Sequence, residues 1–161
     1  METNPITEIE SNINVASEKI IAKDFKFYHV QLIPRIANLT HIHSDKCSIC
    51  SENMKVVTEL SLNVANLLNS SIQNRNTYDN TLSNLKSHLK NAHQYYPKSY
   101  FSSLYTFYGM IGGAIVGLLI FAIQLIDFKI GLLIFSAIGL FTGKIAGYYK
   151  DKRNEKNKLI L

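Results

Sequence analysis

The chain has 161 residues, of which 17 are Lys or Arg, 12 are Asp or Glu and two are Cys, so its formal net charge is +5. This length accommodates one ordinary domain, or a small domain with a membrane part, and it excludes a TIM barrel or a two-domain dehydrogenase. Two cysteines exclude a disulfide-dense secreted scaffold. The positive net charge alone would suggest a protein that binds nucleic acid. However, the apolar residues are concentrated in the last third of the chain, and the surplus positive charge lies mainly beside them.

Residues 1–24 have the pattern of an acidic amphipathic helix. Over residues 6–22, apolar side chains recur at alternating steps of three and four, at Ile6, Ile9, Ile13, Ala16 and Ile20. Five acidic residues and two lysines in the first 24 positions argue against direct binding of this helix to anionic lipid. No apolar core of a secretory signal opens the chain. We therefore expect a cytosolic helix here.

Residues 25–98 are predicted to form a cytosolic helical module. Its clearest helices cover residues 51–69 and 77–92, each with apolar side chains at helical spacing. The polar segment between them, residues 69–76, is too short for anything but an antiparallel return, and Thr77 is a plausible N-cap of the second helix. The predicted fold class is therefore all-α, with an antiparallel helical hairpin in the cytosolic module.

Two pairs of metal-ligand residues flank this hairpin. Cys47 and Cys50 form C-x2-C, and His88 and His93 form H-x4-H, which are the ligand types and spacings of a tetrahedral zinc site. A hairpin that turns near residue 73 brings Cys50 and His93 level to within about 5 Å along the helix axis. The histidines do not share a face of a straight helix, so the helix must loosen or end between them. We predict a structural zinc site that staples the open end of the hairpin and whose thiols stay reduced in the cytosol.

Other uses of these residues remain open. His41 or His43 could complete a local site with Cys47 and Cys50, or the two cysteines could form a redox pair. A nucleic-acid finger is disfavoured, because 37 residues separate Cys50 from His88 where a DNA-reading finger has about a dozen. Neither H-E-x-x-H, G-x-S-x-G nor a phosphate-binding glycine loop occurs in a suitable context, so we predict that the chain is not an enzyme.

Residues 99–149 are predicted to form a transmembrane hairpin. The span 104–126 has 23 residues without a charge, and the span 130–149 is apolar except for Lys144. A helix of about 20 apolar residues crosses the hydrocarbon core of a bilayer. Only Asp127–Lys129 lie between the spans, so the helices are expected to be antiparallel, with both chain ends on one side. The stem of Lys144 is expected to run along the helix toward the headgroups.

Aromatic and basic residues set the orientation of this hairpin. Tyrosines and phenylalanines precede the first span, and Tyr148 and Tyr149 close the second, as is typical of a membrane interface. The tail, residues 150–161, carries five basic side chains against two acidic ones, whereas the opposite side has only Lys129. The positive-inside rule therefore predicts an integral membrane protein with both termini in the cytosol.

Glycines recur every fourth residue in both spans. The two triplets are Gly109, Gly113 and Gly117, and Gly139, Gly143 and Gly147. Glycines four apart share a helix face and let two backbones approach closely. The triplets are symmetric about Phe128, so a hairpin that turns there pairs Gly109 with Gly147, Gly113 with Gly143, and Gly117 with Gly139. We predict packing within one chain, with an intermolecular zipper, and hence a homo-oligomer, as the alternative.

The order of these features resembles an uncharacterised family of small bacterial two-span membrane proteins. The shared features are Cys47–Cys50, His88–His93, Tyr95-Tyr96-Pro97, the glycines from 109 to 147 and the basic segment Tyr148–Lys158. The resemblance covers most of residues 28–158, and its spans are similar to glycine-zipper two-span domains. It implies the bacterial inner membrane as the location and no known activity.

Two classes of function follow from these predictions. In the first, the chain is a membrane-anchored zinc-binding interaction or scaffold protein, which binds an unidentified protein partner and no nucleic acid. In the second, it is an oligomerising membrane effector that permeabilises or remodels the bilayer. The symmetric glycines favour the first class, because packing within one chain would occupy their faces. A third class, metal sensing or zinc-linked redox control, would need a site that releases its zinc readily.

Overall fold

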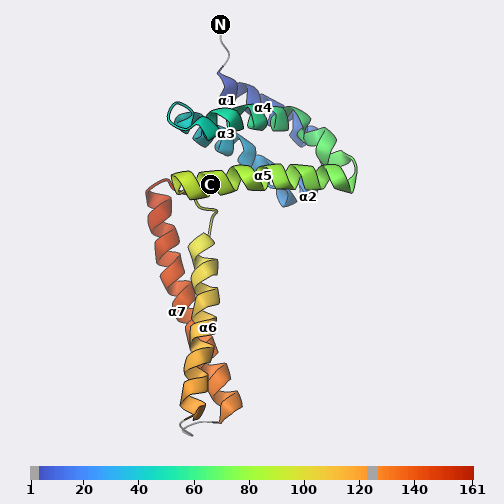
Figure 1. Cartoon of the computed structure of the whole chain (residues 1–161). Helices are drawn as coiled ribbons and strands as arrows, with labels where there is room; N and C mark the ends of the chain where they lie inside the picture. Colours follow the sequence, from blue (N-terminus) through green and yellow to red (C-terminus); the bar gives the residue numbers. More distant parts are fainter. Residues whose placement is uncertain (1–3, 123–126) are drawn as a thin grey trace. The chain divides into compact units, whose positions relative to one another are not determined.

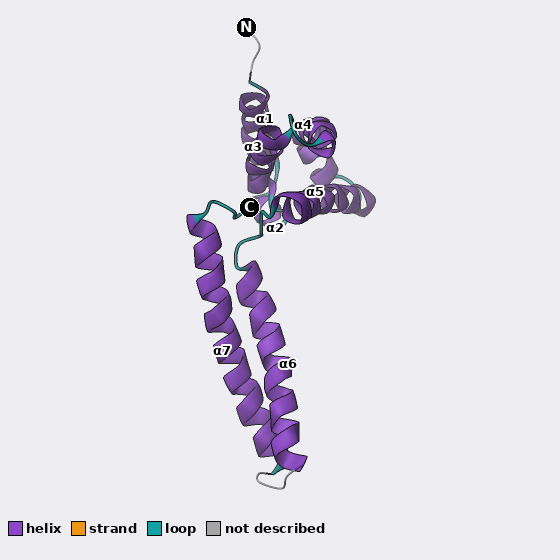
Figure 2. Ribbon diagram, turned by 60° about the vertical axis from the view of Figure 1, so that its left-hand side comes forward, coloured by secondary structure: helices purple, strands orange, loops and turns teal. Residues whose placement is uncertain are grey.

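The computed structural model describes residues 4–122 and 127–161, and its regular elements are helices. In chain order they are α1 (Pro5–Lys19), α2 (Ala22–Phe27), the 3-10 helix η1 (Val30–Leu32), α3 (Ile33–His43), α4 (Ser48–Asn69), α5 (Ile72–His93), α6 (Tyr100–Ala122) and α7 (Phe128–Lys156) (Figures 1 and 2). The described residues include no sheet strand, only one isolated β-bridge between Tyr96 and Ile160. The all-α prediction is confirmed.

The chain divides into two compact units. One unit reaches to Tyr95 and also includes Leu161, and the other covers Tyr96–Ile160. The segments 1–24 and 25–98, which the sequence pattern separates, therefore fall largely within one unit. The predicted transmembrane hairpin and most of the basic tail share the other.

Helix α1 is part of the core of the first unit. Asn4 caps it, because its side-chain oxygen accepts a hydrogen bond from the backbone N–H of Ile6 at 3.1 Å. The predicted apolar stripe is buried at Ile9, Ile13, Ala16 and Ile20. These side chains pack in one cluster with residues of α3, α4 and α5. The acidic face of α1 is therefore left toward solvent, while its apolar face stabilises the unit.

Helices α4 and α5 form an antiparallel hairpin whose turn is shorter than predicted (Figure 1). Helix α4 ends at Asn69 and α5 begins at Ile72, with Ser71 as the N-cap whose hydroxyl accepts a backbone N–H bond. The prediction that Thr77 is the N-cap is wrong. Thr77 lies inside α5, where its hydroxyl donates to the carbonyl of Gln73 at 3.0 Å. The earlier serine offers the same capping chemistry and allows α5 to gain more than one turn.

The core of the first unit is larger than that of an isolated hairpin. Helix α4 packs against α1 and α3 as well as against α5. Tyr78 of α5 is fully buried, and its hydroxyl donates to the backbone carbonyl of Tyr28 at 3.0 Å. Burial raises the pKa of Tyr78 far above its usual range, so the hydroxyl stays protonated and remains a donor.

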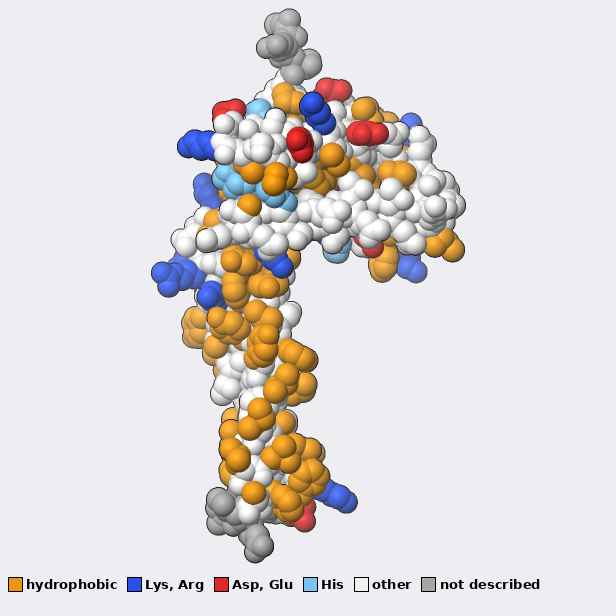
Figure 3. Space-filling model, viewed as in Figure 1, with side chains coloured by type: hydrophobic (Ala, Val, Ile, Leu, Met, Phe, Trp, Pro, Cys, Tyr) orange, Lys and Arg blue, Asp and Glu red, His pale blue; other side chains and the backbone are white. Residues whose placement is uncertain are grey.

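The second unit contains two helices that are long and apolar enough to cross a membrane. They have 23 and 29 residues. In the most apolar 18-residue stretch of each helix, only 6% and 17% is buried. A core helix of a soluble protein would be mostly buried, whereas these helices expose apolar side chains along their length (Figure 3). The end of the predicted first span, residues 123–126, lies outside the described residues. Lys144 is exposed, as its predicted path toward the headgroups requires.

Helices α6 and α7 pack through their glycines, but the predicted register is wrong. A Cβ atom added at Gly109 would collide with the carbonyl group of Gly139, and one added at Gly117 would lie 2.9 Å from the carbonyl oxygen of Gly131. Gly109 thus faces a residue eight positions earlier than Gly147, which is a shift of about 12 Å along α7. The three predicted pairs that fail are Gly109 with Gly147, Gly113 with Gly143, and Gly117 with Gly139.

The start of α7 agrees with this shift. Asp127 is the N-cap of α7, and its side chain accepts the backbone N–H of Lys129 at 2.9 Å. Phe128 and Lys129 therefore belong to the helix and not to the turn that the symmetric glycines suggested. Each of Gly109, Gly113 and Gly117 accordingly faces a residue of α7 eight positions earlier than predicted.

Gly113 and Gly143 face the backbone carbonyl groups of Phe135 and Tyr105, and not the glycines that were predicted to face them. A Cβ atom at Gly113 would lie 3.1 Å from the Cα of Ser136, and one at Gly143 would lie 3.2 Å from the Cα of Thr106. Gly131, which is outside both triplets, is buried against Gly117. The close contact is therefore made within the chain, by glycines of each helix that lie against the backbone of the other.

The far end of α7 is tied to the start of α6. The carboxylate of Asp151 accepts the backbone N–H groups of Phe101 and Ser102 at 3.0 and 2.8 Å. A carboxylate in this position both caps α6 and is stabilised by the helix dipole. Helix α7 continues to Lys156, so much of the predicted tail is helical.

Candidate metal site

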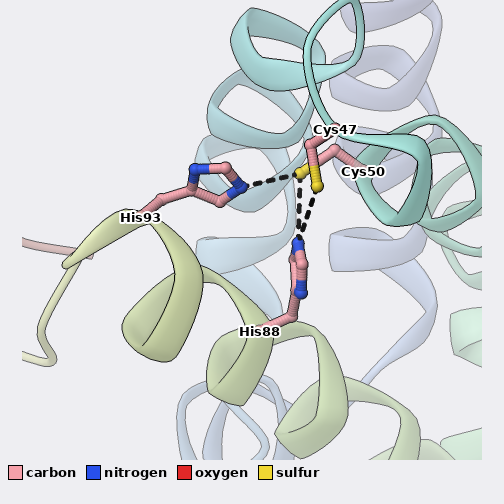
Figure 4. A group of neighbouring side chains, drawn as sticks. All are labelled: Cys47, Cys50, His88 and His93. Atoms are coloured by element: carbon pink, nitrogen blue, oxygen red, sulfur yellow. Dashed lines mark hydrogen bonds between the residues drawn. The ribbon is translucent and has the colours of Figure 1, made fainter.

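The structure brings Cys47, Cys50, His88 and His93 together (Figure 4). The Nε2 atom of His88 lies 3.5 Å from Sγ of Cys47 and 3.3 Å from Sγ of Cys50. The Nε2 atom of His93 lies 3.2 Å from Sγ of Cys50. All four ligand atoms lie within 4.8 Å of one another, so the group could hold a metal ion.

The two cysteines are placed by the start of α4. Cys47 is the N-cap of this helix, with an extended backbone, and Cys50 lies in the first turn. The carbonyl of Cys47 accepts the backbone N–H of Ser51 at 3.1 Å, which closes that turn. A C-x2-C sequence that wraps around a first helical turn therefore directs both sulfur atoms to one side (Figure 4).

The two histidines are placed by the last turn of α5. The helix runs through His88 and ends at His93, because Gln94 adopts a left-handed conformation with φ of 60°. The carbonyl of Leu89, between the two histidines, accepts N–H groups from both Gln94 and Tyr95. This turn is wider than an ordinary α-helical turn. Helix α5 is continuous from His88 to His93, and the prediction that it loosens or ends between them is wrong. Both rings nevertheless reach Sγ of Cys50, at 3.3 and 3.2 Å.

The length of the hairpin arms explains why the two pairs meet. Cys50 lies 20 residues before Ser70, and His93 lies 22 residues after Ser71. At about 1.5 Å per residue, the two arms differ by only about 3 Å. The shorter turn thus aligns the cysteines and histidines somewhat better than the turn predicted near residue 73.

The distances fit one tetrahedrally coordinated ion. Zinc bonds of about 2.3 Å to sulfur and about 2.0 Å to nitrogen give sulfur–nitrogen edges of about 3.5 Å. The observed distances of 3.2 to 3.5 Å are close to this value. The compact group suits a single ion better than a cluster of several metal atoms, whose ligands lie farther apart.

Burial shifts the pKa values of two of these four side chains. Burial raises the pKa of the Cys50 thiol to about 12, and a hydrogen bond and the charge of Cys47 add to the increase. Reactive redox cysteines instead have lowered pKa values. Burial, and then the neighbouring His43 and His88, lower the pKa of His93, which favours the neutral imidazole that binds metals. A bound cation would supply the charge that the thiolates need.

Sequence reasoning treated His43 only as an alternative ligand and missed its actual position. Its ring stacks on that of His93, with centroids 4.0 Å apart and planes inclined by 17°. Its Nε2 atom lies 3.3 Å from the hydroxyl oxygen of Tyr95. His41, the other alternative, has an exposed side chain. Neither residue belongs to the group of four among the residues that the structure describes. The signal for His43 was its place at the end of α3, four residues before Cys47.

We expect His43→Ala to weaken zinc binding by about 10-fold, because contacts around a metal ligand fix the orientation of its ring. His43→Phe should retain most of the affinity, since a phenyl ring can keep the stacking on His93. The exposed His41 provides the matched control, and His41→Ala should leave the affinity unchanged. Competition with a zinc chelator measures the affinities, and the visible spectrum of the cobalt-substituted protein reports the ligand geometry. Equal affinities for all variants would contradict a positioning role.

No known protein-family model, curated protein or solved structure matches this chain. The resemblance to small bacterial two-span proteins therefore stays a prediction, as does the bacterial inner membrane as the location.

Proposed function

We propose that the chain is a membrane-anchored interaction or scaffold protein in which a structural zinc ion fixes the fold of the first unit. The observation that carries this proposal is the convergence of two thiols and two imidazoles from the opposite arms of the α4–α5 hairpin. With these residues as ligands, the ion would join the first turn of one helix to the last turn of the other.

The ligand set supports a structural role. Four protein ligands complete a tetrahedral zinc site and leave no position for water or substrate, unlike the open sites of zinc enzymes. The absence of a catalytic motif in the sequence agrees with this assignment. Cys50 is fully buried, so one ligand would lie inside the unit and the ion would act as a staple between helices.

The membrane anchor is supported by the composition and exposure of α6 and α7. Their exposed apolar surface has an unfavourable hydration free energy unless lipid or protein covers it. The helix lengths match the hydrocarbon core of a bilayer. Basic residues cluster where α7 ends, while Asp127 and Lys129 balance each other at the opposite turn. The positive-inside rule then favours cytosolic termini.

A protein partner would bind the hairpin face or α1, and on α1 it would meet the polar face and not the apolar stripe. Ile9, Ile13 and Ala16 are buried in the unit and cannot serve a partner. The exposed side of the same helix carries Glu8, Glu10 and Glu18. A partner that binds α1 should therefore present basic or hydrogen-bonding groups.

Metal analysis of the full chain purified in detergent tests the zinc assignment. We expect one zinc ion per wild-type chain and less than half of that in Cys47→Ser, because a hydroxyl is a much poorer zinc ligand than a thiolate. His29→Ala, which changes a histidine outside the group of four, is the matched control and should keep its zinc. Equal metal content in wild type and Cys47→Ser would show that the assigned ligands are wrong.

A further inference from the structure

A cationic hollow lies on the surface of the second unit where α7 passes its last apolar residues. It encloses about 420 Å³ and is lined by Tyr149, Lys150, Arg153 and Asn154. All four side chains can donate hydrogen bonds, and two carry positive charge. No carboxylate lines this hollow among the residues that the structure describes. Its chemistry therefore suits an anion with several acceptor oxygens, such as a phosphate group.

The carboxylates of the neighbouring Asp151 and Glu155 do not line this hollow. The carboxylate of Asp151 is occupied by the two backbone N–H groups at the start of α6. Glu155 lines a separate hollow together with Lys98 and Lys152, where both signs of charge are present. The hollow formed by Tyr149, Lys150, Arg153 and Asn154 thus keeps an unbalanced positive charge.

Among the lining side chains, Lys150 has a defined position and Asn154 has an unpaired hydrogen-bond donor. The ammonium of Lys150 lies over the rings of Phe101 and Tyr105, 4.8 and 6.0 Å from their centroids, which holds it beside α6. The Nδ2 atom of Asn154 is buried and has no hydrogen-bond partner. A buried unpaired amide is unfavourable, and the oxygen of a bound anion could satisfy it after a small movement of the flexible Lys150 or Arg153 side chain.

The position of the hollow along α7 identifies the source of the anion. From Phe128 to Tyr149 the helix rises by about 32 Å, close to the thickness of the hydrocarbon core. Tyr149 to Asn154 would therefore lie at the level of the lipid headgroups. Resting on the proposed membrane anchor, we infer that this hollow binds the headgroup phosphate of an anionic phospholipid.

Lipid titration of the full chain in dodecyl maltoside, followed by native mass spectrometry, tests this site. Phosphatidylglycerol is compared with phosphatidylcholine of the same acyl chains. We expect the wild type to prefer phosphatidylglycerol, and Lys150→Gln/Arg153→Gln to bind it about 10-fold more weakly or worse, since both basic groups attract the anionic headgroup. Lys156→Gln/Lys158→Gln removes the same charge outside the hollow and should keep most of the affinity.

Three results would overturn the inference. The two double variants could lose affinity equally, which would indicate diffuse attraction to the basic tail. The wild type could show no preference between the two lipids. Excess inorganic phosphate could displace the bound lipid, which would make a free anion the ligand. Extraction of membranes with alkaline carbonate separates these results from failure of the anchor itself: a chain that is washed off refutes the anchor, whereas one that stays without lipid preference refutes only the headgroup site.

Discussion

Removing zinc with a chelator is expected to lower the thermal unfolding midpoint of the unit that ends at Tyr95 by about 10 °C or more. In a domain of this size each kcal/mol moves the midpoint by about 4–8 °C, and a structural zinc ion contributes at least a few kcal/mol. The ion would be lost from the open ends of α4 and α5, while the apolar core around Tyr78 remains. We therefore expect destabilisation with retained helical structure at low temperature.

Hydrogen exchange of the full chain, with and without the chelator, locates this effect. The last turn of α5 and the first turn of α4 should lose protection first, because the proposed ion would join them directly. In Cys47→Ser the chelator should have little further effect, since the metal is already absent. His41→Ala should behave as the wild type does. Unchanged protection and an unchanged midpoint after verified metal removal would refute the role of zinc as a staple.

Replacing Gly139 by Ala is expected to destabilise the α6–α7 pair by about 1–3 kcal/mol, the usual range for overpacking. The added Cβ atom would collide with the backbone carbonyl of Gly109 and lie 3.2 Å from the Cα of Gly113. Backbone atoms cannot rotate away, so the helices would have to separate. Unfolding in mixed micelles of increasing sodium dodecyl sulfate content, followed by circular dichroism and electrophoretic mobility, measures the change.

Gly112 provides the matched control for this experiment. A Cβ atom added there meets nothing within 4 Å, and alanine is the better helix former. We expect Gly112→Ala to be neutral or slightly stabilising, so the two substitutions should have effects of opposite sign. If Gly139→Ala instead dissolves a large oligomer and leaves the pair itself unchanged, the glycines act between chains. Ion leakage from vesicles that contain the wild type would then favour the membrane-effector alternative.

Local sequence patterns were sufficient to locate the long helices, though not all of their ends, and to choose the residues of the candidate metal site. The three–four spacing of Ile9, Ile13 and Ala16 defines the buried face of α1, because helical periodicity alone decides which side chains align. The uncharged stretch from Leu104 likewise needs no tertiary information, since its length and composition match the apolar thickness of a bilayer. The meeting of the cysteines with His88 and His93 follows from counting residues on the two arms of a hairpin.

The register of α6 against α7 and the surroundings of the candidate metal ligands depended on tertiary contacts that no local sequence pattern encodes. The symmetry of the glycines about Phe128 predicted one pairing, but Phe128 lies inside α7 and the observed partners of Gly109, Gly113 and Gly117 lie eight residues earlier. A small displacement at a turn is carried along both helices, whereas glycine spacing repeats every four residues and tolerates several registers. The stacking of His43 on His93 was also beyond the sequence, because it requires the end of α3 to lie beside the end of α5. Sequence alone therefore determined where the long helices lie and which residues are candidate ligands, because both depend on local spacing. Tertiary structure decided the helix ends at the caps, which faces meet and how each candidate ligand is supported.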